Sequence, residues 1–363
     1  DGWFGRRDDD RSSLGDWTVD RRKLPGGLED LAGRITRLGL GFGLWFEPEM
    51  VSPDSDLYRT HPDWCLHVAG RDRTLGRHQL VLDLSRADVC DHLVRAVCAV
   101  LASAPISYVK WDMNRHLTEV GSAGLPPARQ RETAHRHILG LYRVLEEITR
   151  RFPQVLFESC SGGGGRFDPG MLFYMPQTWT SDNSDAVSRL KIQYGTSLAY
   201  PLGTAAAHVS AVPNHQTGRT TPLQTRGLVA LSGVFGYELD PTQLTADERE
   251  EVRAQVALCK ELRALVQTGD FYRLCDPFRD GGEAGWMVVD GPRREAVCFY
   301  FRVLAEANAP RRRLRLRGLD PQRDYRLVGS DERFGGDLLM FAGLPAPELP
   351  GDFRGWMWHF RAE

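Results

Sequence analysis

The chain has 363 residues, of which 42% are hydrophobic and 26% charged, and its formal net charge at pH 7 is -2. This composition is typical of a folded globular protein, and the balanced charge argues against a nucleic-acid-binding surface. No apolar run reaches the length of about 18 residues that a membrane-spanning helix needs, so we expect no membrane partner.

Short apolar runs alternate with longer helical patterns over most of the chain. The runs that predict strands lie at 42–46, 79–84, 106–110, 155–157, 177–179 and 205–212. The clearest helical patterns lie at 87–102, 132–152, 186–198 and 248–265. Such alternation predicts a parallel sheet, and polar residues just after the strand ends are typical of the catalytic rim of a (β/α)8 TIM barrel. An open doubly wound sheet is the alternative, although no GxGxxG follows a strand.

The number of predicted strands and a late change of pattern suggest the domain organisation. Six strands do not close an eight-stranded barrel, so we expect a barrel over 1–270 that is missing its first strands. Alternating segments at 286–289, 296–302, 312–316 and 356–360, separated by turn residues, predict antiparallel strands. The fold class is therefore expected to be α/β, with the partial barrel followed by a small C-terminal antiparallel β-sandwich domain over 271–363.

The most informative segment is VKWDMNR at 109–115, at the end of a predicted strand. Side chains alternate faces along a strand, so Lys110, Asp112 and Asn114 are expected to project to the same side. Lys occurs only at positions 23, 110, 191 and 260 in a chain that otherwise uses Arg. An adjacent ammonium favours the ionised carboxylate, which a nucleophilic aspartate needs. The alternative is an ordinary ion pair at a strand end.

Metal and disulfide signatures are absent from the sequence. The seven cysteines are scattered without a CxxC pair, and they predict neither a disulfide framework nor a zinc site. The histidines at 61, 116, 208 and 215 have no metal-ligand spacing with each other. We therefore expect no metal, no cofactor and a cytoplasmic location.

Eight motifs, in this order along the chain, resemble those of glycoside hydrolase family 36, the α-galactosidases of bacterial type. They are DGWFGRRDDD at 1–10, LGDW at 14–17, GLWFEPEMV at 43–51, SDLYRTHPDW at 55–64, RHQLVLDL at 77–84, VKWDMNR at 109–115, ESCSGGGGRFD at 158–168 and WTSDNSDAVSR at 179–189. The resemblance covers the chain essentially end to end. It also implies an N-terminal β-sandwich and two barrel strands, which we expect to precede residue 1.

The resemblance implies roles for individual residues. Asp112 is implied to be the nucleophile that forms a galactosyl-enzyme, and Asp182 the general acid/base. The implied substrate-binding residues are Asp1, Trp45, Arg77, Lys110, Asn114, Cys160 and Gly162. Among them, Asp1 is implied to bind the galactose 4- and 6-hydroxyls. Retaining glycosidases place their two carboxyl groups about 5–5.5 Å apart, a distance that sequence spacing cannot supply.

The function implied by the resemblance is that of a retaining exo-α-galactosidase acting on terminal α-1,6-linked galactose, as in melibiose and raffinose. The alternatives are a galactosyl transferase or an α-N-acetylgalactosaminidase of the same fold, or a non-catalytic sugar-binding protein. Cys160 and Gly162 favour plain galactose, because the pocket near the sugar 2-position is expected to be small. Asp112 and Asp182 together disfavour sugar binding alone. The expected partners are galactosides and further copies of the protein, as a homo-oligomer such as a tetramer, with no nucleic acid.

Overall fold

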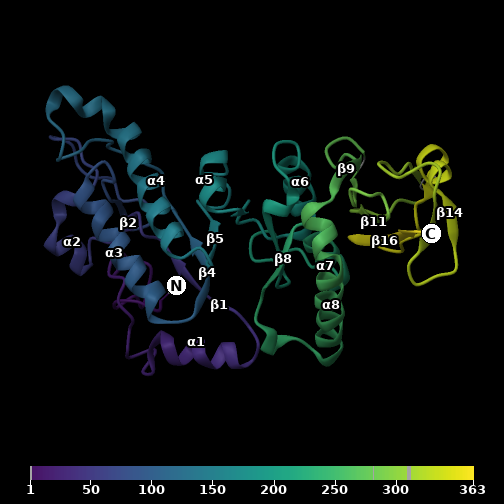
Figure 1. The fold of residues 1–363 in the computed structure, drawn as a ribbon, viewed down its shortest axis with the longest axis horizontal. Helices are drawn as coiled ribbons and strands as arrows, with labels where there is room; N and C mark the ends of the chain where they lie inside the picture. Colours follow the sequence, from purple (N-terminus) through teal and green to yellow (C-terminus); the bar gives the residue numbers. More distant parts are fainter. Residues whose placement is uncertain (1, 281, 309–311) are drawn as a thin grey trace. The chain divides into compact units, whose positions relative to one another are not determined.

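The computed structural model describes residues 2–280, 282–308 and 312–363. The chain divides into two compact units, one ending at Trp179 and the other beginning at Thr180 (Figure 1). Each unit has its own hydrophobic core. Within the described ranges, no helix combines the length and the apolar character that crossing a membrane requires.

The first unit contains four parallel strands that pair in the order β1-β4-β5-β6. Their bounds are β1 Phe42–Phe46, β4 Ile106–Trp111, β5 Leu156–Ser159 and β6 Gln177–Trp179. The helices of this unit are α1 Gly27–Arg37, α2 Asp56–Thr60, α3 Ala87–Ser103, α4 Thr133–Arg151 and α5 Pro169–Tyr174. Helices α3 and α4 pack side by side and connect successive strands, as the parallel direction requires (Figure 1).

The register of the parallel strands aligns one polar row of side chains across the sheet. Trp45 pairs with Lys110, Lys110 with Glu158, and Glu158 with Gln177. The next position along each strand gives a second row, which is almost completely buried: Phe46, Trp111, Ser159 and Thr178. Because neighbouring residues of a strand face opposite sides, the fold separates a polar face from the face packed in the core.

The predicted strand at 79–84 is wrong as a member of the parallel sheet. Only Leu80–Val81 (β3) forms a strand there, and it pairs antiparallel with Met50–Val51 (β2) in a separate small sheet. Extension stops because Asp83 Oδ1 accepts hydrogen bonds from the Ser85 backbone N–H at 3.0 Å and the Ser85 hydroxyl at 2.6 Å. An Asp that bonds two residues ahead in this way favours a turn over a strand.

The second unit begins with α/β elements that the sequence predicts only in part. The helices are α6 Ala186–Thr196, α7 Leu223–Leu231 and α8 Ala246–Thr268, and the parallel strands are β7 Ala205–Ser210 and β8 Val234–Glu238. Helix α7 and strand β8 lie outside the predicted elements, as does α1 in the first unit. Gly227 within α7 and Gly236 within β8 weaken the local signal, because glycine favours neither structure.

An antiparallel sheet of order β14-β13-β16-β11-β10-β9 completes the second unit. Its strands are β9 Asp270–Cys275, β10 Glu283–Val289, β11 Glu295–Arg302, β13 Asp324–Leu327, β14 Arg333–Gly335 and β16 Arg354–Ala362. A smaller sheet pairs β12 Arg313–Leu314 with β15 Leu344–Pro345, and a π-helical turn spans Leu338–Ala342.

Both faces of the antiparallel sheet are covered. Trp286 and Phe299 pack on one face in a cluster that includes Leu262 of α8. Met287 packs on the other face, in a cluster that includes Leu314 of the small sheet. A parallel α/β part followed by an antiparallel β-domain is the fold class that the sequence predicts. The domain division at residue 270 stays a prediction, since the compact units divide after Trp179.

Helix α8 begins with a capping box. Thr245 Oγ1 accepts the Glu248 backbone N–H at 3.2 Å, and Glu248 Oε2 accepts the Thr245 backbone N–H at 2.9 Å. We expect Thr245→Ala to cost about 1 kcal/mol locally, which is roughly a fivefold faster amide exchange in the first turn of α8. Thr268→Ala at the other end of the same helix is the control and should leave that turn unchanged. Equal acceleration by both variants would contradict the capping role.

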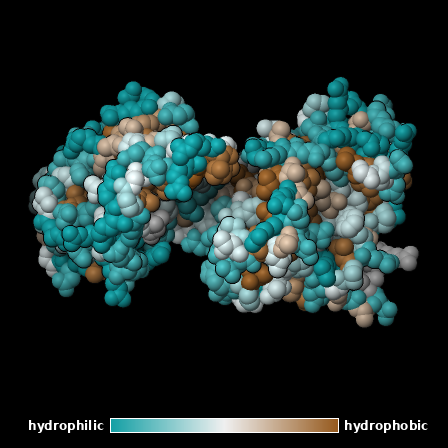
Figure 2. Space-filling model, turned by 90° about the horizontal axis from the view of Figure 1, so that it is seen from below, coloured by the Kyte–Doolittle hydropathy of each residue, from teal (hydrophilic) through white to brown (hydrophobic). Residues whose placement is uncertain are grey.

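The surface is mainly hydrophilic, with apolar areas that include exposed large side chains (Figure 2). The most exposed are Phe173, Leu38 and Phe341, at 77%, 76% and 71%. They come from separate parts of the chain, and singly exposed apolar side chains are normal in folded proteins. They therefore do not identify an interface by themselves.

Candidate active site

Asp112 directly follows β4 and is held in one orientation. Its backbone N–H donates to the Phe46 carbonyl at 2.7 Å, which extends the sheet pairing by one bond. Its Oδ2 accepts the Trp45 indole N–H at 3.0 Å and the Asn114 side-chain amide at 2.7 Å. Its Oδ1 accepts the Met113 backbone N–H at 2.9 Å, and the residue is only 6% exposed. These donors stabilise a carboxylate and fix both of its oxygens.

Lys110 is held by an acidic partner on the neighbouring strand. Its Nζ lies 3.4 Å from Glu158 Oε1 and 5.0 Å from the centre of the Trp179 ring. Burial alone would lower the pKa of Lys110, but the carboxylates of Glu158 and, to a smaller extent, Asp112 oppose burial and the pKa is raised. The side chain therefore remains an ammonium that faces Asp112 as a nearby charge, while its ion pair is with Glu158.

Cys160 and Gly162 follow β5 on the same side of the sheet as Asp112. The Cys160 backbone N–H donates to the Trp111 carbonyl at 2.9 Å. Burial, followed by the charge of Asp112, raises the pKa of the Cys160 thiol, so the thiol stays protonated. Gly162 has φ 52°, and a Cβ added there would meet no heavy atom within 4 Å. The space beside Gly162 is open for a ligand.

A cavity of about 490 Å³ in the first unit includes Asn114, Gly162 and Arg166 in its lining. One wall is anchored by a buried ion pair, in which Arg166 NH1 lies 2.9 Å from both oxygens of Glu49. Glu49 also accepts the Trp111 indole N–H at 2.9 Å. The loop that carries Gly162 is thereby tied to β4, the strand that directly precedes Asp112.

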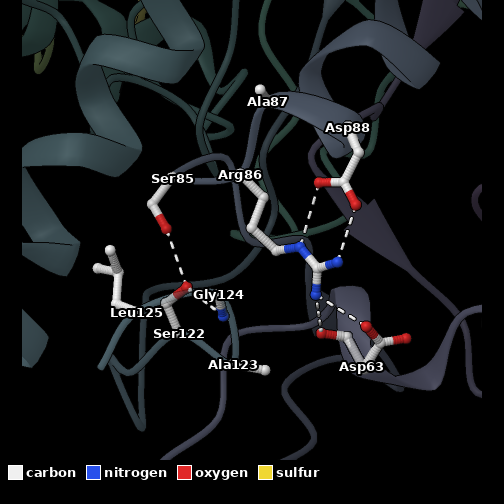
Figure 3. Close-up of a pocket in the computed structure, with 9 residues that line it drawn as sticks. All are labelled: Asp63, Ser85, Arg86, Ala87, Asp88, Ser122, Ala123, Gly124 and Leu125. Atoms are coloured by element: carbon white, nitrogen blue, oxygen red, sulfur yellow. Dashed lines mark hydrogen bonds and ion pairs between the residues drawn. The ribbon is translucent and has the colours of Figure 1, made fainter. Parts of the chain in front are cut away.

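A second cavity of the first unit, about 570 Å³ in volume, contains none of the predicted site residues (Figure 3). Arg86 crosses it and donates to Asp63 and to Asp88, each at 2.8 Å (Figure 3). Ser85 and Ser122 lie on its other side, with their hydroxyl oxygens 3.1 Å apart. Because two carboxylates already neutralise the guanidinium, this cavity offers little attraction to an anion.

Asp182 lies in the second unit, just before α6, and is exposed. The buried Arg189 holds the backbone around it, donating to the Ser181 carbonyl at 3.1 Å and to the Ala206 carbonyl at 2.6 Å. Asp185 caps α6 by accepting a backbone N–H of its first turn. The segment that carries Asp182 is therefore fixed within its own unit, and the role of Asp182 opposite Asp112 stays a prediction.

The roles of two further predicted sugar-site residues, Asp1 and Arg77, stay untested. Asp1 lies outside the described residues. Arg77 is exposed, in a left-handed backbone conformation with φ 51°, and its role stays a prediction. Within the described part of the chain, no group of three or more His, Cys, Asp and Glu side chains is arranged to hold a metal ion.

Two residues of β6 that contact this polar row were not singled out by the sequence analysis as site residues. Gln177 donates to Glu158 from the next strand, and Trp179 stacks under Lys110. Residues 177 and 179 share one face of β6, so period-two alternation from Trp179 is the signal that points to Gln177. What the sequence lacks is the register that brings Gln177 opposite Glu158.

Comparison with known families gives two matches. The melibiase family profile matches residues 1–269, and the profile of the glycosyl hydrolase family 36 C-terminal domain matches residues 283–360. Together they span nearly the whole chain.

Comparison with individual proteins points the same way. The chain is 66% identical to alpha-galactosidase AgaA of Geobacillus stearothermophilus and 50% identical to alpha-galactosidase 1 of Pediococcus pentosaceus, covering 100% of this chain and 49% of each relative. It therefore spans about half the length of the curated relatives it matches. A crystal structure of an AgaA variant in complex with raffinose superposes with a TM-score of 0.98 at 65% identity, over 100% of this chain and 50% of the other.

Proposed function

Because this chain belongs to the melibiase family and carries the C-terminal domain of glycosyl hydrolase family 36, we propose that the whole protein is a retaining exo-α-galactosidase. Its substrates are terminal α-1,6-linked galactosides such as melibiose and raffinose. The raffinose and stachyose complexes of the Geobacillus AgaA variants support this choice of substrate. The reaction is a double displacement with Asp112 as nucleophile and Asp182 as general acid/base.

The observation that carries this proposal is the set of donors around Asp112. Trp45, Asn114 and the Met113 backbone fix the carboxylate, so attack on the anomeric carbon needs little reorientation. The same donors stabilise the charge of the resting nucleophile, and the Lys110 ammonium nearby adds to that effect. A sugar-binding site without chemistry does not require a carboxylate held in this way.

In the first half-reaction, Asp112 attacks the anomeric carbon while Asp182 protonates the leaving oxygen. In the second, Asp182 deprotonates a water that releases galactose from Asp112. Lys110 and Asn114 serve as hydroxyl-binding neighbours, and Trp45 presents part of its ring to the sugar. Cys160 and Gly162 border the 2-hydroxyl, and this arrangement favours galactose over its bulkier 2-acetamido analogue.

We also propose a cytoplasmic location and a homo-oligomeric state for the whole protein. All seven cysteines are free, and six of them are buried, which is consistent with a reducing compartment such as the cytoplasm. The family resemblance supports assembly of the whole protein into a homo-oligomer such as a tetramer.

Product stereochemistry tests the mechanism directly. With an aryl α-galactoside and the whole protein, we expect proton NMR to show α-galactose first, with the β-anomer growing only through slow mutarotation. Two inversions at the anomeric carbon give this result. An initial β-galactose signal would exclude double displacement, and formation of an oligosaccharide instead of free galactose would favour the transferase alternative.

A further inference from the structure

Glu47 is a buried carboxylate that is hydrogen-bonded to Asn114, and Asn114 is in turn hydrogen-bonded to Asp112. Glu47 directly follows β1 and is 1% exposed. Its Oε1 accepts the Asn114 backbone N–H at 2.6 Å, and its Oε2 accepts the Gln79 side-chain amide at 3.1 Å. The side chain of the same Asn114 donates to Asp112 Oδ2 at 2.7 Å. Glu47 therefore holds the backbone of the residue whose side chain holds Asp112.

We propose that Glu47 is a positioning residue whose ionised carboxylate fixes Asn114 against Asp112 and thereby supports turnover. The inference rests on the proposed function, because it assigns Glu47 a part in the action of Asp112. A hydrogen bond from an N–H to an ionised carboxylate is about twice as strong as one to a neutral acceptor. Protonation of Glu47 weakens its hydrogen bond to the Asn114 backbone. The Asn114 side chain is then held less firmly in its orientation towards Asp112.

The surroundings of Glu47 make its ionisation sensitive to pH near neutrality. The charged groups that act on it among the described residues are Asp112, beyond β4, and Arg7, in the N-terminal segment; Asn114 and Gln79 face it as neutral amides. Burial raises the pKa of Glu47 to about 7, the Asn114 backbone hydrogen bond opposes that rise, and the charge of Asp112 adds to it.

Gln79 is arranged to accommodate either form of Glu47. Its amide nitrogen donates to the ionised carboxylate, while its Oε1 is buried with no hydrogen-bond partner among the described residues. If Glu47 is protonated, a turn of the Gln79 amide brings Oε1 to the new O–H donor. In either orientation of the Gln79 amide, one of its two polar atoms bonds to Glu47 and the other has no partner. The protonation state of Glu47 therefore decides which orientation is adopted.

The test compares Glu47→Gln with the whole wild-type protein on an aryl α-galactoside with a good leaving group. The glutamine keeps an acceptor for Asn114 but is neutral at every pH, so it mimics the protonated form. The ratio of kcat/KM, wild type over variant, should be about 10 at pH 8.5 and should fall towards 1 at pH 5.5, with a midpoint near 7. A ratio that does not change with pH would reduce Glu47 to a structural role and overturn the proposal.

A matched control uses a partly exposed glutamate of the same unit. Hydrogen bonds from Arg129 and Arg136 lower the pKa of Glu132 to about 2, so it stays charged over the whole range. Glu132→Gln should therefore give a ratio near 1 at every pH. A pH-dependent ratio for this control would show that the Glu47 result does not come from the site.

A measurement independent of turnover separates this inference from the proposed function. The pKa of Glu47 is higher in the folded protein than in the unfolded chain. The stability of the wild type should therefore fall as the pH rises from about 4.5 to 7, and it should be constant above that range. The melting temperature of Glu47→Gln minus that of wild type should thus rise over this window and stay constant above it. A protein that shows this rise but cleaves no galactoside would refute the proposed function alone; a flat difference would overturn the inference.

A second variant covers the case in which Glu47→Gln does not fold. Gln79→Leu removes the donor at Glu47 Oε2 and leaves the carboxylate in place. Loss of a donor to the charged form raises a carboxyl pKa, so the midpoint of the acid limb of kcat/KM should move about one unit to higher pH. An unmoved midpoint would contradict the assignment of that limb to Glu47.

Discussion

Asp112→Gly should lower kcat/KM of the whole protein on an aryl α-galactoside by roughly four orders of magnitude or more, because the covalent step loses its nucleophile. The glycine also removes the acceptor for Trp45 and Asn114, and it leaves room beside the anomeric carbon. Azide should enter this space and restore part of the turnover. Its product should be β-galactosyl azide, since azide attacks from the face that Asp112 occupies. Turnover is followed by release of the phenol and the product by NMR.

The matched control is Asp63→Gly, which removes an exposed carboxylate of the same unit that pairs with Arg86. It should keep turnover close to that of wild type and should give no galactosyl azide. Unchanged activity in Asp112→Gly would refute the nucleophile assignment. Lost activity in both variants would point to unfolding instead, which circular dichroism distinguishes.

Asp182→Ala should have an effect that depends on the leaving group. A general acid contributes about 10²–10⁴-fold when the departing oxygen needs a proton, and little when it leaves readily as an anion. We therefore expect kcat/KM to fall by about three orders of magnitude for melibiose and by much less for a nitrophenyl galactoside. Equal losses on both substrates would count against Asp182 as the acid.

Azide also distinguishes Asp182 from Asp112. In Asp182→Ala the galactosyl-enzyme still forms from an activated substrate, and azide attacks it without needing a general base. The product should be α-galactosyl azide, because this is the second inversion. Opposite anomers from the two variants would separate the two roles in one assay, and the same anomer from both would contradict the assignment.

The strongest strands and helices could be predicted because their signals are local. Strand β1 was expected at the bounds observed, and helix α3 within one residue of them. The segment at 79–84 has the same apolar character as the true barrel strands, and it differs only in its partner, β2, and in the turn that Asp83 closes. Pairing partners depend on contacts distant in sequence, so composition cannot supply them.

In the candidate site, the strand end that carries Lys110 and Asp112 could be identified from the sequence. The hydrogen bonds and the ion pair that surround these two residues could not. The sequence places Lys110 two residues before Asp112, whereas the structure pairs Lys110 with Glu158 on the next strand. That pair depends on register across β4 and β5. The link from Glu47 to Asp112 through Asn114 likewise emerges only from the backbone positions of two segments that are distant in sequence.

The alternation across β1, β4, β5 and β6 limits how this strand scaffold can diversify. A single-residue insertion within β4 would drive Lys110 into the packed interior and turn the indole of Trp111 towards the sugar. Substitutions in the loops after the strand ends leave this alternation intact, although Gly162 itself is best kept, because its φ of 52° strains any side chain. Efforts to alter substrate preference should therefore target the loops and leave strand lengths untouched.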